Sequence, residues 1–215
     1  MNQLRKSYSR ESEEKRRQDL IIATQACVER GGIGEASIRR IADEAGVTPG
    51  LVRHYFADKE ALICAAYRQT MDDMFRGARD GLDSMQGSAL EKLHHFIMTS
   101  LQPGVMNSRY HQLWASFTSL TRSTPSMAKI HHESYLEFRM GCQDLVEALF
   151  AELGRPVSDK ELERYGIMVN ALLDGLWLEG CLAMELFENG ELADIGLQSV
   201  QSVLGIEGLA ELKSA

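Results

Sequence analysis

The sequence predicts an all-α protein of about nine helices, in which a three-helix head precedes a larger helical body. Apolar residues recur at helical spacing along most of the 215 residues. Runs of β-branched residues bounded by turn residues are nearly absent, and short stretches with proline or glycine separate the helical patterns. With 44% hydrophobic and 25% charged residues the composition is that of an ordinary globular chain, and the length allows a sizeable core.

The first residues are polar and basic. Residues 1–12 lack the apolar surface that would hold them in place, so we expect a flexible basic N-terminal tail. A first helix should begin at Glu13, where apolar residues start to recur, and should end at the glycine pair that starts with Gly31. We predict a head over residues 13–60 and a body over residues 61–215.

Two short helices follow in the head. Ser37 has the side chain of an N-cap and should begin a helix that Gly46 ends. Thr48 should cap the next helix, with Pro49 at its first position, where the missing N–H does no harm. This third helix should end near Phe56.

The remaining helices make up the body. Asp58 should cap a fourth helix that reaches the glycine-containing stretch 81–87. Proline and glycine punctuation then separates five further helices. We expect these at residues 88–101, 105–121, 126–153, 159–188 and 191–204.

The stretch SIRRIADEAGVTPGLVRHYF, residues 37–56, has the spacing of two helices that cross steeply. Ala42 is small where the helices would touch, and Gly46 tolerates the positive φ of a tight turn. Val52 and Phe56 are assigned to the core between the helices. The pattern favours a helix-turn-helix, and a plain helical hairpin is the alternative.

The start of the third helix carries groups that suit DNA. Thr48 can donate its hydroxyl to a phosphate, and Gly50 has no side chain to hold the backbone away from DNA. Arg53 is our candidate for a guanine contact in the major groove, and Lys59 adds a cation for a phosphate. Tyr55 can instead belong to the core. The residues themselves thus suggest DNA contacts at Ser37, Arg39, Arg40, Thr48, Gly50, Arg53, His54, Tyr55 and Lys59.

Charge divides near residue 60. Residues 1–60 hold 11 Lys and Arg against 10 Asp and Glu, whereas residues 61–215 hold 12 against 21. A near-neutral head on an acidic body is compatible with a small DNA-binding domain at the front of the chain. A tail with Arg5, Lys6 and Arg10 can enter an adjacent minor groove, or it can be an ordinary solvated tail.

The longer stretch SIRRIADEAGVTPGLVRHYFADKEAL resembles the N-terminal helix-turn-helix of the TetR family of bacterial repressors, over about residues 13–65. The resemblance implies an all-helical subunit, a homodimer and a palindromic double-stranded DNA operator. Arg53 stands where many members have tyrosine, so the family's base preference does not carry over. The family's contacts map onto Ser37, Thr48, Pro49, Gly50, Arg53, His54, Tyr55 and Lys59.

The body contains an unusually apolar helix. Residues 162–188 are apolar over more than one helical stripe, which predicts burial against both the same subunit and a partner. The last helix, 191–204, offers a second apolar face. Two such helices from each chain would form a four-helix seam in a homodimer.

The same helix carries a polar face. Asn170, Asp174 and Trp177 lie on one side of it, and another helix places Tyr110, Trp114 and Phe117 on one side as well. Aromatic rings with one carboxylate suit a quaternary ammonium ion, whose charge is attracted to ring faces. The alternative is an ordinary core in which the carboxylate is hydrogen-bonded or paired with arginine.

Two stretches, LWASFTSLTRSTPSM and ALLDGLWLEG, resemble the C-terminal domain of the BetI-like branch of the TetR family, which represses choline-to-glycine-betaine genes. This resemblance implies choline or a related osmoprotectant precursor as the small-molecule inducer. It makes residues 13–60 the DNA-binding domain and residues 61–215 the ligand-binding and dimerisation domain. A sensor of a hydrophobic drug or of another metabolite is the alternative within the family.

Other classes of protein lack support in the sequence. The four cysteines form no C-x-x-C pair, and His131-His132-Glu133 lacks the further histidine of a metalloprotease motif, so we expect no metal site. We find no G-x-S-x-G, dinucleotide or phosphate-binding motif, and therefore expect neither catalysis nor a cofactor. No secretory signal or membrane-length apolar run is evident, which places the chain in the cytoplasm. A helical enzyme or scaffold without DNA binding is the alternative from another class.

Overall fold

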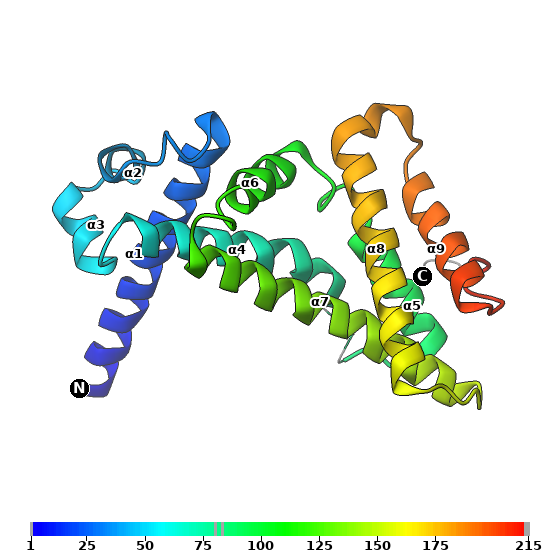
Figure 1. The fold of residues 1–215 in the computed structure, drawn as a ribbon. Helices are drawn as coiled ribbons and strands as arrows, with labels where there is room; N and C mark the ends of the chain where they lie inside the picture. Colours follow the sequence, from blue (N-terminus) through cyan, green and yellow to red (C-terminus); the bar gives the residue numbers. More distant parts are fainter. Residues whose placement is uncertain (1, 80, 83, 213–215) are drawn as a thin grey trace. The chain divides into compact units, whose positions relative to one another are not determined.

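The computed structural model describes residues 2–79, 81–82 and 84–212, with side chains from residue 13 onward. Within these residues the chain forms nine α-helices, one short 3-10 helix and no strand, which confirms the predicted class (Figure 1). The helices are α1 Asn2–Gly31, α2 Ile38–Glu44, α3 Pro49–Tyr55, α4 Lys59–Arg79, α5 Ala89–Ser100, α6 Ser108–Thr118, α7 Pro125–Glu152, α8 Asp159–Ala183, η1 Met184–Leu186 and α9 Glu191–Leu204.

The helices form two compact units. Unit 1 contains the chain up to Met71 together with Gln112–His131, and unit 2 contains Asp72–His111 and the chain from His132 onward. Unit 1 therefore extends beyond the head that we predicted to end at residue 60. The extension has a physical reason, since Gln25 of α1 donates its side-chain amide to Thr70 Oγ1 of α4 at 3.0 Å in the interior of this unit.

Side-chain caps fix the short helices of unit 1 as predicted. Ser37 Oγ accepts the Arg40 N–H at 3.3 Å at the start of α2. Thr48 Oγ1 accepts the Leu51 N–H at 3.3 Å at the start of α3, and Pro49 occupies the first turn. These bonds satisfy backbone donors that a helix start leaves without partners.

Two helix starts differ from prediction. The first helix begins at Asn2 rather than at Glu13, because the added segment is rich in good helix formers such as Leu, Arg, Lys and Glu, which continue an existing helix. The side chains of the basic tail residues lie outside the described part of the chain. Helix α6 begins at Ser108 rather than at 105, because Asn107 Oδ1 accepts the Tyr110 N–H at 3.0 Å and so starts the helix there.

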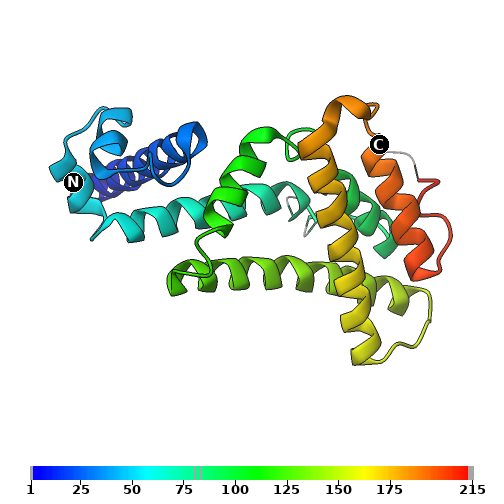
Figure 2. The ribbon, with the colours of Figure 1, turned by 45° about the horizontal axis from the view of Figure 1, so that its top comes forward.

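In unit 2, α8 and α9 run side by side, as the orange and red helices show in both ribbon views (Figures 1 and 2), and α5 packs against α9. Glycines permit this close approach. A Cβ added at Gly180 would lie 2.5 Å from Met106 Sδ, and one at Gly196 would lie 2.8 Å from Leu101 Cδ1. The core of this unit is apolar and includes Phe96, Phe150 and other side chains without exposed surface.

Candidate DNA-binding surface and ligand site

The turn between α2 and α3 has the geometry expected of a helix-turn-helix. Gly46 adopts a left-handed conformation with φ of 64°, and the N–H after it, from Val47, donates to the Ala42 carbonyl at 2.9 Å. Ala42 and Val52 are fully buried, and Phe56 is only 4% exposed. The predicted assignment of Val52 and Phe56 to the core is confirmed.

The outer side of α3 is open to solvent. The Thr48 oxygen accepts the Leu51 N–H, so its hydroxyl proton remains available for an acceptor such as a phosphate oxygen. Arg53 is exposed and has no ion-pair partner among the described residues. Of the predicted DNA contacts, Arg39, Thr48, Gly50, Arg53, His54 and Lys59 are exposed, and Ser37, Pro49 and Tyr55 are half-buried.

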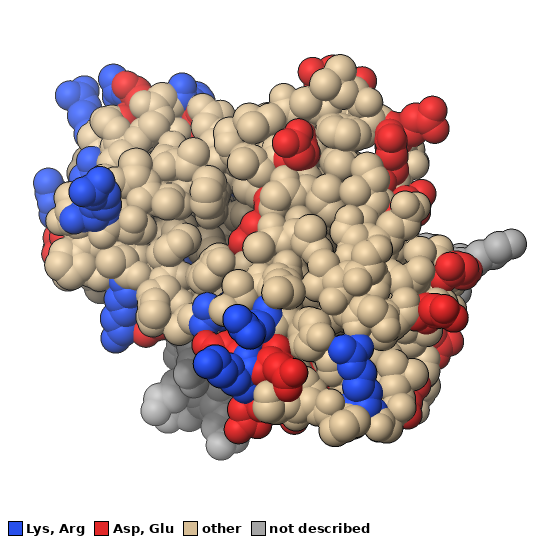
Figure 3. All heavy atoms as spheres, turned by 45° about the vertical axis from the view of Figure 1, so that its right-hand side comes forward, with Lys and Arg blue, Asp and Glu red and all other residues tan. Residues whose placement is uncertain are grey.

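Neighbouring cations divide into paired and unpaired side chains. Arg40 forms an ion pair with Glu35, whereas Arg39 has no such partner within the described part of the chain. Lys59 donates its Nζ to the Ile33 carbonyl at 3.4 Å while remaining exposed. Arg39 is therefore the α2 arginine that is free to meet a phosphate. The face in Figure 3 also shows blue Lys and Arg side chains over the part that carries these helices and red carboxylates over much of unit 2.

Sequence reasoning missed the role of Arg17. Its Nη1 donates to the Tyr55 carbonyl at 3.3 Å, and its guanidinium lies 4.4 Å from the centre of the Phe56 ring. The bond satisfies a carbonyl at the C-terminus of α3, where a cation is favourable. Arg17 thus holds the reading helix from behind. Its spacing from Phe56 gives no signal in the sequence, because 39 positions separate the two residues.

The polar face predicted on α8 forms a hydrogen-bonded cluster in unit 2. Asn170 is 1% exposed, and its Nδ2 donates to Asp174 Oδ2 at 2.8 Å and to the Tyr135 hydroxyl of α7 at 3.0 Å. Asp174 keeps access to solvent but is crowded by surrounding protein, and this desolvation raises its pKa to about 6 against the opposing bond from Asn170. The carboxylate has no cationic partner among the described residues.

The aromatic residues are distributed differently from our prediction. Trp177 belongs to the α8 cluster in unit 2, where its Nε1 donates to the Val105 carbonyl at 3.1 Å and its ring lies 6.3 Å from that of His111. Tyr110 is half-buried in the same unit. Trp114 and Phe117 belong to unit 1, and Phe117 is fully buried, with its ring stacked 5.1 Å from Tyr67. Phe117 is therefore a core residue in this structure, as the alternative reading held.

Comparison with known proteins now adds to these observations. Residues 20–66 match the profile for bacterial regulatory proteins of the TetR family, and residues 89–205 match the profile for the C-terminal domain of BetI-type transcriptional repressors. The second match alone covers more than half of the chain. The chain belongs to the TetR family, with a BetI-type C-terminal domain. As a member of this family it is a DNA-binding transcriptional regulator and not an enzyme.

Relatives of this TetR-family chain support the assignment. The HTH-type transcriptional regulator BetI of Pseudomonas aeruginosa PAO1 is 28% identical over 181 residues, which cover 84% of this chain and 88% of the relative. BetI of Escherichia coli HS is 28% identical over 169 residues, which cover 78% and 83%.

Solved structures agree. A protein of P. aeruginosa PAO1 described as a transcriptional regulator is 31% identical, covers 92% of this chain and 93% of its own, and superposes with a TM-score of 0.81. A regulator from Saccharomonospora viridis, crystallised in complex with choline, has the same fold at 16% identity, with 89% and 96% coverage and a TM-score of 0.67.

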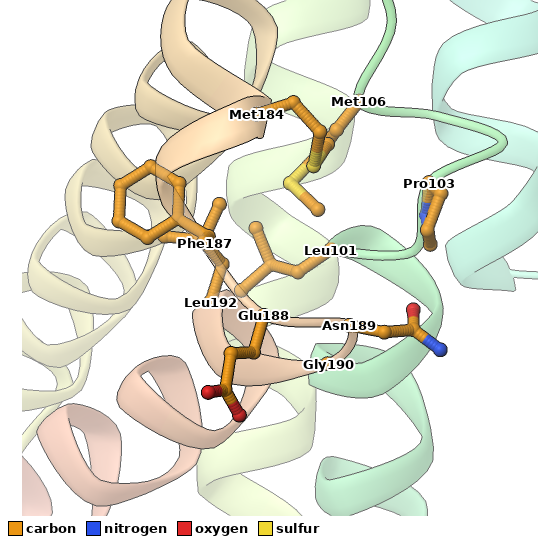
Figure 4. A pocket seen from close by; sticks show the side chains of 9 residues that line it. All are labelled: Leu101, Pro103, Met106, Met184, Phe187, Glu188, Asn189, Gly190 and Leu192. Carbon is orange, nitrogen blue, oxygen red and sulfur yellow. The ribbon is translucent and has the colours of Figure 1, made fainter.

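Unit 2 of this TetR-family protein also contains a cavity that sequence reasoning missed. It measures about 230 Å³ and lies where η1 and the following loop meet the end of α5. Figure 4 shows Met106, Met184 and Leu101 converging, while the polar ends of Glu188 and Asn189 point away from them. The cavity can therefore accept a small apolar group. The sequence signal was weak, because the helix break that forms the cavity follows apolar residues that read as a continued helix to 188.

One side of α8 exposes large apolar side chains. Ile167, Leu178, Leu182 and the neighbouring Leu186 are 42%, 37%, 61% and 75% exposed. The segment Asp159–Leu186 is long and apolar enough to cross a membrane by length and composition alone, and little of it is buried. Its apolar surface therefore calls for a cover that a single chain does not supply.

The thiols and other donor groups suggest no metal chemistry. The described residues contain no group of three or more His, Cys, Asp or Glu placed to hold a metal ion. Burial raises the pKa of Cys181 to about 11, which keeps this thiol protonated at neutral pH. All four cysteines are free, as predicted, although Cys64 and Cys181 are only partly buried.

Proposed function

We propose that this TetR-family regulator is a homodimeric repressor that binds an inverted-repeat operator and releases it when a choline-like quaternary ammonium ion binds unit 2. The observation that carries the ligand assignment is the Asn170–Asp174–Trp177 cluster. It offers a carboxylate without a cationic partner beside an indole ring, which is the combination that favours a diffuse cation.

The DNA half of the proposal rests on α3. The exposed groups from Thr48 to Arg53 lie on a rigid helix whose inner side is buried through Val52. Such an arrangement presents a donor for phosphate at the helix start and a long guanidinium for a base edge. Because the protein acts on DNA, we place it in the cytoplasm.

The dimer half rests on the exposed apolar side of α8. A second copy that applies the same surface would bury these leucines in a self-complementary seam, with α9 contributing Ile195, which is 36% exposed. A membrane would also cover such a surface. The carboxylates of Asp174 and Glu179 are exposed on the same helix, however, and they favour a protein partner over lipid.

The ligand assignment has two supports beyond the cluster. The BetI-like relatives cover most of the chain, and a structural neighbour of the same fold binds choline. For the ligand to release DNA, it must bind the two conformations of the dimer with different affinity.

The experiment that tests this function combines calorimetry with an operator-release assay. Wild type should bind choline and lose affinity for an inverted-repeat duplex as choline is added. Trp177→Ala should weaken choline binding, because the indole ring is removed, while DNA binding without ligand is retained. Choline binding that is identical in both proteins, or DNA affinity that choline leaves unchanged, contradicts the proposal.

The cavity beside η1 favours a second candidate within the same family, a sensor of a small apolar compound. Its lining residues Leu101, Met106 and Phe187 are apolar, and methionine adapts to varied shapes. Release of the operator by an uncharged apolar compound, and not by choline, would support this candidate.

A further inference from the structure

A buried acceptor lies in the α8 cluster. Asn170 is 1% exposed, and its Oδ1 has no hydrogen-bond partner, a condition that among the described buried side-chain atoms it shares with His95 Nε2 alone. A buried acceptor that is left without a partner opposes folding, so such groups are rare and point to a role.

The orientation of this amide is determined by its neighbours. The Nδ2 group donates to both Asp174 and Tyr135, at 2.8 and 3.0 Å. A reversed amide would place its oxygen against the Asp174 carboxylate and repel it. The oxygen is therefore held away from these two partners, one helical turn from the carboxylate that we assign to the ligand cation.

The cluster thus presents acceptors to a ligand. Asp174 offers carboxylate oxygens with a negative charge, and Asn170 offers the amide oxygen. A ligand satisfies both when it carries a positive charge and, on the same small molecule, a hydrogen-bond donor. A ligand whose second group is a carboxylate would bring acceptors and negative charge against acceptors and negative charge.

We propose that Asn170 Oδ1 accepts a hydrogen bond from the ligand and makes this site select hydroxylated quaternary ammonium ions over zwitterionic ones and over those without a donor. This inference rests on the proposed function, since it specifies the ligand of the same site. The site thereby distinguishes an alcohol from the carboxylate that full oxidation of the alcohol would give.

Choline and propyltrimethylammonium test the inference because they differ only in a terminal hydroxyl or methyl group. Titration calorimetry on the full-length dimer should show choline binding at least tenfold tighter than propyltrimethylammonium, and glycine betaine binding weaker still. The preference runs against the hydrophobic effect, which by itself favours the methyl group.

The variant Asn170→Leu should reduce the preference to threefold or less, mainly by weakening choline, while propyltrimethylammonium keeps its affinity. Glu163→Gln, an exposed change on the same helix, is the control and should preserve the preference. The comparison in wild type decides the matter even if Asn170→Leu does not fold.

The outcomes separate the two proposals. If choline and propyltrimethylammonium bind wild type equally well, or if glycine betaine binds as tightly as choline, the role of Asn170 is overturned while the quaternary ammonium function stands. If none of the three ligands binds, the proposed function itself fails, and the inference fails with it.

Discussion

The affinity for choline should depend on pH through Asp174. Desolvation raises the pKa of this carboxyl to about 6 in the free protein, and a bound cation would stabilise the charged form and lower the pKa again. Binding therefore requires the deprotonated carboxylate. With a pKa of about 6, about 3% of the groups are protonated at pH 7.5 and about 90% at pH 5. The apparent Kd should rise about tenfold between these values.

Calorimetry at pH 5.0, 6.0, 7.0 and 8.0 measures this dependence, and choline itself does not titrate in that range. Asp174→Asn should bind about tenfold more weakly than wild type at pH 7.5 and should show no further loss at pH 5. His111 is a second titratable group near the Trp177 ring, so His111→Gln is the control and should retain the wild-type midpoint. A wild-type Kd that changes less than twofold, or a tenfold change that persists in Asp174→Asn, would refute the reasoning.

Three further predictions concern the head and the dimer. Arg53→Ala should relax sequence preference at one base pair in each half-site, whereas Lys59→Ala should weaken binding to all duplexes alike and reduce the salt slope; competition with scrambled duplexes measures both, and equal effects on cognate and scrambled DNA would contradict these roles. Arg17→Met should cost about 1–2 kcal/mol of unfolding free energy in urea titrations and weaken operator binding, and a stability equal to wild type would show that the α3 contact contributes nothing. Leu182→Glu should yield a folded monomer in light scattering, because a carboxylate buried in the seam costs on the order of several kcal/mol; the equally exposed control Ile22→Glu should stay dimeric, and a dimeric Leu182→Glu would place the interface elsewhere.

Local signals in the sequence sufficed for most of the fold. Caps such as Ser37 and Thr48 and the turn glycine Gly46 act through neighbours three or four positions away, so their effect is visible in the sequence. The periodicity of apolar residues likewise located nine helices among the described residues. Errors occurred at ends without a strong signal, such as the start of α1.

The site was harder to predict because its parts meet only in three dimensions. Asn170, Asp174 and Trp177 share one helix, and their proximity followed from helical spacing. The partner that Tyr135 provides from α7, and the division of Trp114 and Phe117 from Trp177 into different compact units, depend on long-range packing. No spacing rule within one helix encodes either of them.

The position of the cluster on α8 suggests how binding can reach the dimer. Asn170 and Asp174 alternate along this helix with Ile167, Leu178 and Leu182, which lie on its exposed apolar side. Gly166 and Gly180 bring α8 so close to its neighbours that an added Cβ would lie within 3.0 Å of Gln143 and of Met106 respectively. A helix packed this tightly cannot absorb a change at the cluster by side-chain rearrangement alone, so a ligand that draws Asp174 and Asn170 toward itself shifts the helix as a unit. Because the same helix would form the seam, that shift alters how the two subunits meet and thereby the spacing of their reading helices.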